Sequence, residues 1–83
     1  MKLTIKYFAS IREAAGVGSE VLVTEAATVA ALRGELLARD GPLAAALAPG
    51  RAVRTALNQS LCDESALLTD ACEVAFFPPV TGG

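Results

Sequence analysis

The chain has 83 residues, of which 53% are hydrophobic, and a formal net charge of -2 at pH 7. This length suits one small domain with a single core. A small negative charge is not typical of a protein that binds nucleic acid. No apolar run approaches the ~20 residues that a membrane span requires. We therefore expect a cytoplasmic protein that binds neither nucleic acid nor membrane.

The residue types also limit the chemistry that the chain can perform alone. It has no histidine, which excludes a Ser-His or Cys-His nucleophilic pair. Its two cysteines, Cys62 and Cys72, cannot close a tetrahedral zinc site and are predicted to be free thiols. Gly16-Val17-Gly18 lacks the third glycine of a dinucleotide-binding loop. The sequence thus predicts no metal site and no complete active site, so that a partner must supply the pocket for any catalysis.

Alternating apolar and polar residues at the N-terminus predict a strand with Leu3, Ile5 and Tyr7 on one face. The polar stretch that contains Gly16 and Gly18 is predicted to be the long loop of a β-hairpin. Further along, the pattern predicts a strand over 20–24, a helix over 29–39, a helical turn over 43–47, and strands over 53–58, 61–62 and 73–77.

Thr28 is the predicted N-cap of the main helix, and Val29, Leu32 and Leu36 form its core-facing stripe. Asp40-Gly41-Pro42 is predicted to end it, with the glycine as a left-handed cap.

The order of two strands, a helix and three strands predicts an α+β fold, in which the helix covers one face of a mixed sheet. The last strand is the most hydrophobic, so we place it centrally and parallel to the first. Phe8 and Phe77 then fall on the open face, together with Leu61. Neighbouring aromatic residues on an uncovered sheet face predict a docking patch for a partner protein.

The chain closes with a segment that differs in character from the rest. We divide it into a domain over 1–77 and an extended tail over 78–83. Pro78 and Pro79 stiffen the start of this tail. Gly82 and Gly83 have no Cβ, so they are slender enough to thread a narrow channel and present the terminal carboxylate.

Three segments of the chain resemble the small, sulfur-carrying subunits of molybdopterin synthases, which have the ubiquitin-like β-grasp fold. They are Tyr7-Phe8-Ala9-Ser10-Ile11-Arg12-Glu13 with Gly16, Asn58-Gln59, and the closing Glu73-Val74-Ala75-Phe76-Phe77-Pro78-Pro79-Val80-Thr81-Gly82-Gly83. The closing segment matches residue for residue. One departure is Ala71-Cys72, where such subunits usually carry Gly-Asp.

The resemblance implies a carrier whose C-terminal Gly83 is adenylated by a ubiquitin-activating-like adenylyltransferase that consumes ATP. A sulfur donor protein then supplies the sulfur of a C-terminal thiocarboxylate. The tail would enter the large subunit of a heterotetrameric synthase and donate sulfur to cyclic pyranopterin monophosphate in molybdenum cofactor biosynthesis. No cofactor would be bound permanently. Gly82 would give clearance in the channel, which would grip Pro78, Pro79, Val80 and Thr81.

Three alternatives remain open at this stage. The Gly-Gly end also suits a ubiquitin-like modifier that is joined to lysines of target proteins. A sulfur carrier of another pathway, such as that of the thiamine precursor, would share both fold and tail chemistry. The last alternative is a β-grasp interaction module without C-terminal chemistry.

Overall fold

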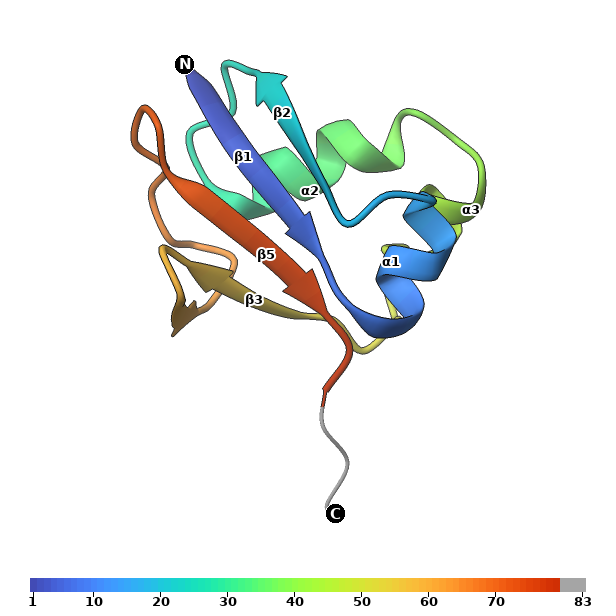
Figure 1. The fold of residues 1–83 in the computed structure, drawn as a ribbon. Coiled ribbons are helices and arrows are strands. Elements are labelled where there is room, and N and C mark those ends of the chain that lie inside the picture. Colours follow the sequence, from blue (N-terminus) through green and yellow to red (C-terminus); the bar gives the residue numbers. More distant parts are fainter. Residues whose placement is uncertain (80–83) are drawn as a thin grey trace.

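The computed structural model describes residues 1–79. Figure 1 shows a sheet with helices on one side and around one end. The elements, in chain order, are β1 (Lys2–Tyr7), α1 (Ala9–Ala15), β2 (Ser19–Val23), α2 (Val29–Leu37), α3 (Pro42–Ala46), β3 (Arg54–Leu57), β4 (Ser60–Cys62) and β5 (Glu73–Phe77).

The sheet has five strands in the order β2-β1-β5-β3-β4. β5 is central and runs parallel to β1, while the β1–β2, β3–β5 and β3–β4 pairs are antiparallel (Figure 1). This is the mixed sheet of the β-grasp fold, and it confirms the predicted central place of the last strand. The backbone of β5 is thereby hydrogen-bonded to a neighbouring strand on both edges.

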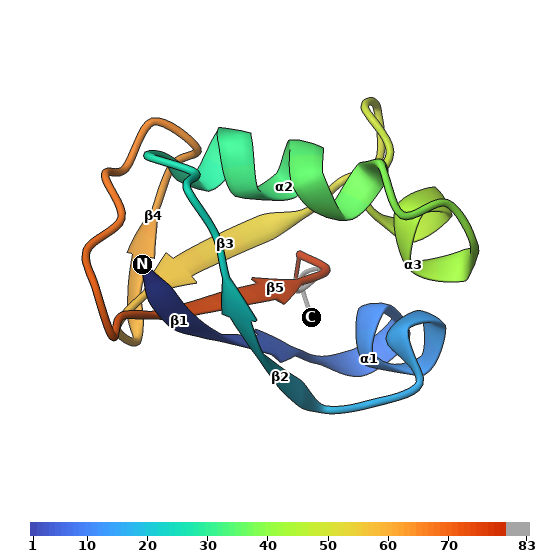
Figure 2. The same cartoon turned by 90° about the horizontal axis from the view of Figure 1, so that it is seen from above.

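Helix α2 crosses one face of this sheet (Figure 2). Its stripe residues Val29, Leu32 and Leu36 are all 0% exposed, as the periodicity predicts. Thr28 caps the helix, because its side chain accepts a hydrogen bond from the Ala31 amide at 3.1 Å. The sheet residues that α2 covers are buried in the same core: Leu3, Ile5, Tyr7, Val74 and Phe76.

A polar network ties the edge of the sheet to the end of α2. The hydroxyl of Tyr7 donates to Glu20 Oε2 at 2.8 Å, and Arg39 pairs with the same carboxylate at 2.9 Å. Burial raises the pKa of Tyr7 far above its usual range, and the bond to Glu20 acts in the same direction. The hydrogen bond from Arg39 lowers the pKa of Glu20. At neutral pH Tyr7 therefore stays protonated and Glu20 stays ionised, so the network is structural.

The predicted long hairpin loop is wrong, because residues 9–15 form α1. This helix starts without a side-chain cap at Phe8 and ends at Gly16, whose φ of 80° is the left-handed conformation that glycine favours. Ile11 is its only buried residue, so the segment lacks the repeated apolar stripe that identifies a helix from sequence. Its ends are fixed by the strands on either side.

The predicted end of the main helix is also wrong, since α2 stops at Leu37 and not at Arg39. Its final turn tightens into i→i−3 bonds, such as that from the Arg39 amide to Leu36 O at 3.2 Å. The left-handed residue here is Asp40, with φ of 60°, whereas Gly41 is the N-cap of α3. Two helices therefore share one junction, which shortens the first.

The turn before β5 contains Ala71-Cys72, the departure noted in the sequence. Ala71 adopts a φ of 66°, a conformation that costs an alanine about 1–2 kcal/mol. The Ala71 amide bonds to Lys2 O at 2.7 Å, and Cys72 is 2% exposed in the core. These contacts hold the turn without a glycine.

Replacing Gly34 with alanine is expected to stabilise the domain. Gly34 is exposed within α2, and a Cβ added there would meet no atom within 4 Å. Alanine is favoured over glycine in a helix by about 1 kcal/mol, which corresponds to about 4–8 °C in a domain of this size. Thermal unfolding followed by circular dichroism measures the shift, and an unchanged or lower midpoint would contradict it.

Among residues 1–79, none of the helices is both long and apolar enough to cross a membrane.

Candidate functional site

The face of the sheet opposite α2 carries a patch of apolar side chains, which we call the docking patch. It consists of Phe8, Leu61 and Phe77 with Ala56 and Ala75. Register places Leu61 beside Ala56, and Ala56 beside Ala75, so these three side chains form one row across β4, β3 and β5. Phe77 lies two residues further along β5 on the same side. The structure thus brings together the three residues that the sequence predicted for this face.

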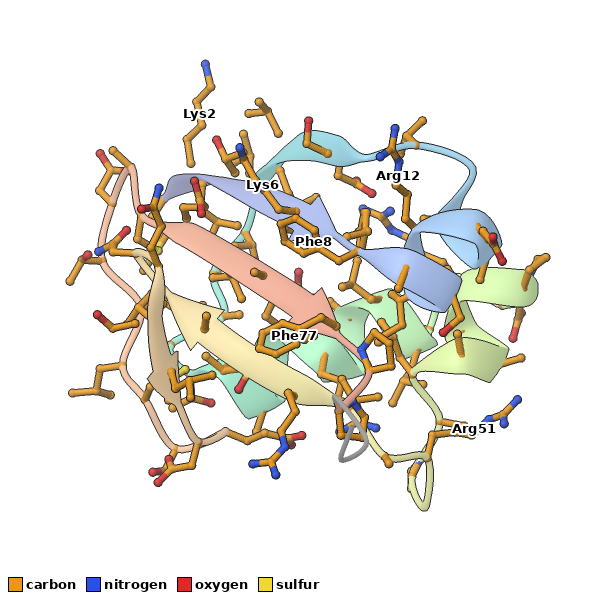
Figure 3. All side chains as sticks on the ribbon, turned by 60° about the horizontal axis from the view of Figure 1, so that its bottom comes forward. Lys2, Lys6, Phe8, Arg12, Arg51 and Phe77 are labelled. Atoms are coloured by element: carbon orange, nitrogen blue, oxygen red, sulfur yellow. The ribbon has the colours of Figure 1, made fainter. Side chains whose placement is uncertain are left out.

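The exposure of the patch residues suits a contact surface. Leu61 is 75% exposed and Phe8 is 47% exposed, while Ala56 and Ala75 form a nearly buried floor between them. Figure 3 shows Phe8 and Phe77 on the same side of the sheet. Phe8 is held at the end of β1, where its amide bonds to Phe76 O at 3.2 Å. The aromatic ring of Phe8 is therefore carried by a backbone fixed to the central strand.

A groove runs beside the point where the chain leaves β5, and we call it the tail-root groove. Its volume is about 620 Å³, and Pro78 and Pro79 form one wall. The other walls come from α1, from α3 and from the segment before β3, with the residues Ser10, Ile11, Ala14, Pro42, Ala45, Ala46, Arg51 and Ala52. Both prolines are half-buried. The root of the tail therefore lies against the domain, over helix α1, which the sequence reading missed.

Helix α3 is fixed in this position by Arg33. The Nε atom of Arg33 donates to Leu47 O at 2.7 Å, and Nη2 donates to Ala48 O at 3.1 Å. A further pair joins Arg33 to Glu64. Leu47 itself is 0% exposed in the core. One side chain of α2 thus anchors the wall of the tail-root groove.

The remaining predicted tail residues, Val80, Thr81, Gly82 and Gly83, lie outside the described residues.

The two cysteines are separate and have structural surroundings. Cys72 is buried in the core cluster. The Sγ of Cys62 lies 3.6 Å from Thr55 Oγ1, on the side of the sheet that faces the core. Both are free thiols, as predicted. Within residues 1–79, no group of three potential metal ligands occurs.

Sequence reasoning missed two basic residues beside the predicted site. Arg51 lines the tail-root groove, and Arg54 is the direct antiparallel neighbour of Phe77. The place of Arg54 follows from the register of the third strand, which the sequence did not define. The place of Arg51 depends on α1 and α3 meeting, for which the sequence carries no signal.

Comparisons with known proteins agree with this geometry. The molybdopterin synthase sulfur carrier subunit of Escherichia coli (strain K12) is 41% identical over 81 residues, covering 98% of this chain and 99% of that protein. The structure of putative molybdopterin converting factor, subunit 1, from Pyrococcus furiosus has a TM-score of 0.77 at 29% identity, covering 96% of this chain and 99% of that one.

A third similar structure is that of a complex of subunits 1 and 2 of molybdopterin-converting factor from Helicobacter pylori 26695. The matching chain has a TM-score of 0.69 at 26% identity, and the match covers 100% of both chains. The model of the ThiS family matches residues 5–83, which include the docking patch, the tail root and the Gly-Gly end. The chain therefore belongs to the ThiS family.

Proposed function

We propose that this protein is the sulfur-carrier subunit of a molybdopterin synthase. The observation that carries the proposal is the 41% identity, over nearly the whole of both chains, to a protein of that name. The closing segment from Glu73 to Gly83 supports the same role, since it joins the central strand to a Gly-Gly end. The protein acts within a sulfur-transfer complex and has no complete active site of its own.

The proposed partner is the large subunit of the synthase. A similar protein from Helicobacter pylori forms a complex of subunits 1 and 2 of molybdopterin-converting factor. Here the docking patch and the tail-root groove lie at the end of β5 from which the tail departs. A partner that covers Phe77 and Pro78 can therefore receive the tail at the same time.

The proposed chemistry takes place at the terminal carboxylate of Gly83. A carboxylate is a poor electrophile, so an activating adenylyltransferase first joins it to the adenylyl group of ATP and releases pyrophosphate. A persulfide sulfur from a donor protein attacks the acyl carbon and displaces AMP, which gives an acyl disulfide. A thiol then attacks the donor protein's sulfur, forms a disulfide with it and releases the thiocarboxylate. In the synthase, the thiocarboxylate sulfur attacks a carbon of the pterin precursor and displaces an oxygen substituent from it. Water then hydrolyses the carbonyl–sulfur bond of the resulting thioester, which leaves the sulfur on the pterin and restores the carboxylate of Gly83.

The role of the domain in this chemistry is to position the terminal carboxylate. It presents the carboxylate at a fixed number of residues from the docking patch, and its thiols take no part. Effective alignment of this kind can supply several kcal/mol of the barrier.

Intact-mass analysis of the protein isolated from its own cells tests the proposal. We expect a fraction in which one oxygen is replaced by sulfur, with fragmentation placing the sulfur at Gly83. Cys62→Ser combined with Cys72→Ala is the matched control, and it should keep this fraction because neither thiol carries the sulfur.

Other outcomes identify the alternatives. Loss of the sulfur-containing fraction in a folded cysteine variant would place the sulfur on a thiol. Isopeptide adducts of Gly83 with lysines of other proteins, without thiocarboxylate, would indicate a protein modifier. A thiocarboxylate that the large subunit cannot use would indicate the carrier of another pathway.

A further inference from the structure

The positive charges of this acidic protein are unevenly distributed. Among residues 1–79 there are three ion pairs. Two of them, Arg33 with Glu64 and Arg39 with Glu20, fix the cations that project from α2 and its end. The third joins Lys6 to Glu73 at the longer distance of 3.9 Å, on the open face of the sheet. The cations on the helix side are thus engaged internally.

Four basic side chains lie around the docking patch, and we call them the cationic rim: Lys6, Arg12, Arg51 and Arg54. Lys6 precedes Phe8 by two residues and points to the same side of the sheet. Arg54 lies directly opposite Phe77 across the β3–β5 pair. Both aromatic residues of the patch therefore have a cation beside them.

The other two members lie on α1 and beside the tail root. The amide of Arg12 bonds to Phe8 O at 3.2 Å, which places Arg12 one turn of α1 beyond the aromatic residue. Arg51 lines the tail-root groove with Pro78 and Pro79. Figure 3 shows Lys6, Arg12 and Arg51 arranged around Phe8 and Phe77. The rim thus extends from the tail root and Phe77 to Phe8 and α1.

The charge count shows how strongly the region of the rim differs from the rest of the chain. The rim has four cations, accompanied by the carboxylates of Glu13 and Glu73, so that this region has a charge of about +2. The rest of the chain has three cations and seven carboxylates, or about -4, which together give the net charge of -2. The net positive charge is therefore concentrated around the docking patch of a chain that is acidic overall.

We infer that the cationic rim binds carboxylate side chains that surround an apolar pocket on the large subunit. The inference rests on the proposed function and names the chemistry of the partner surface. A protein partner fits better than a nucleic acid, because the apolar patch lies between the cations and the remainder of the molecule is acidic. The apolar contact then makes the complex long-lived, and the rim orients the two proteins and speeds their association.

This division of roles has a kinetic signature. Exposed charges at the edge of an interface act mainly on the association rate constant and are screened by salt. Buried apolar anchors act mainly on the dissociation rate constant. Variants of the rim and of the patch should therefore differ in which rate constant changes.

Surface plasmon resonance with the immobilised large subunit measures both constants. For the wild type, raising the salt from ~50 mM to ~500 mM should lower the association rate constant about tenfold. Arg54→Gln should lower it about threefold at low salt, and Arg51→Gln with Arg54→Gln about tenfold, with dissociation nearly unchanged. The double variant should also lose most of the salt dependence.

The matched control is Ala30→Glu, which changes the net charge by the same amount as Arg54→Gln. Ala30 is exposed on α2, on the other side of the sheet, and this variant should associate like the wild type. An equal effect of both variants would mean that only the total charge matters, which would overturn the rim.

Three further results would contradict the inference. Tight wild-type binding whose association rate constant depends neither on salt nor on the two arginine substitutions would contradict the role of the rim. The proposed function would remain intact. A wild type that does not bind the large subunit would overturn the function itself. Capture of a single-stranded RNA oligomer at low salt, lost in the same variants, would replace the protein partner with a nucleic acid.

Discussion

Deletion of Gly83 is expected to abolish molybdopterin formation in a reconstituted synthase and to leave the melting temperature of the carrier unchanged. The deletion moves the carboxylate back by one residue, about 3.3–3.6 Å in an extended chain. A displacement of even ~1 Å can cost about a hundredfold in rate where reacting atoms must align. Among residues 1–79 the core cluster extends no further than Phe76, so we expect the deletion to leave the packing of the domain intact.

Gly82→Val tests the width of the tail in the same assay. The added side chain should block the channel of the partner, so that neither thiocarboxylate nor product forms, while the domain melts like the wild type. Gly34→Ala is the matched control, because it enlarges a glycine within α2 that contacts nothing. It should give full activity. Normal product yield from the Gly83 deletion would refute the carrier mechanism and leave a β-grasp binding domain.

Truncation of the docking patch should have the second largest effect. Buried aromatic anchors at interfaces often cost about 2 kcal/mol or more when replaced by alanine, or roughly thirtyfold in Kd. We expect losses of this order for Phe8→Ala and Phe77→Ala in titrations of the large subunit. Both side chains are partly exposed in the free protein, so the variants should fold, which circular dichroism checks.

Two leucines provide a matched comparison for the patch. Leu61 is 75% exposed beside Ala56, and Leu67 is 70% exposed in the segment between β4 and β5. Leu61→Ala should weaken binding, whereas Leu67→Ala should not. Equal affinities for the two variants, with wild-type affinity for both phenylalanine variants, would show that the open face is not the interface.

The sequence predicted the sheet and the main helix because their signals are periodic. Leu3, Ile5 and Tyr7 alternate on β1, and Val29 and Leu32 lie on one stripe of α2. The central position of β5 followed from its apolar composition. These features depend on burial, which leaves a repeated pattern in the residues.

Features that depend on a single contact were missed. Helix α1 buries only Ile11, so periodicity could not identify it, although Gly16 after a run rich in alanine was a usable signal for its end. The tail-root groove requires α1, α3 and the prolines to meet. The patch residues were predicted from strand alternation, whereas Arg51 depends on this tertiary arrangement.

The position of β5 also determines how the domain responds to mechanical force. A partner that draws on the tail pulls along β5, which is hydrogen-bonded to β1 on one edge and to β3 on the other. Such a load acts in shear, so the bonds of both ladders must break together instead of one after another. A strand at the edge of the sheet would peel away under a smaller force. If a partner holds the tail as proposed, the domain should therefore withstand withdrawal of the tail without β5 peeling from the sheet.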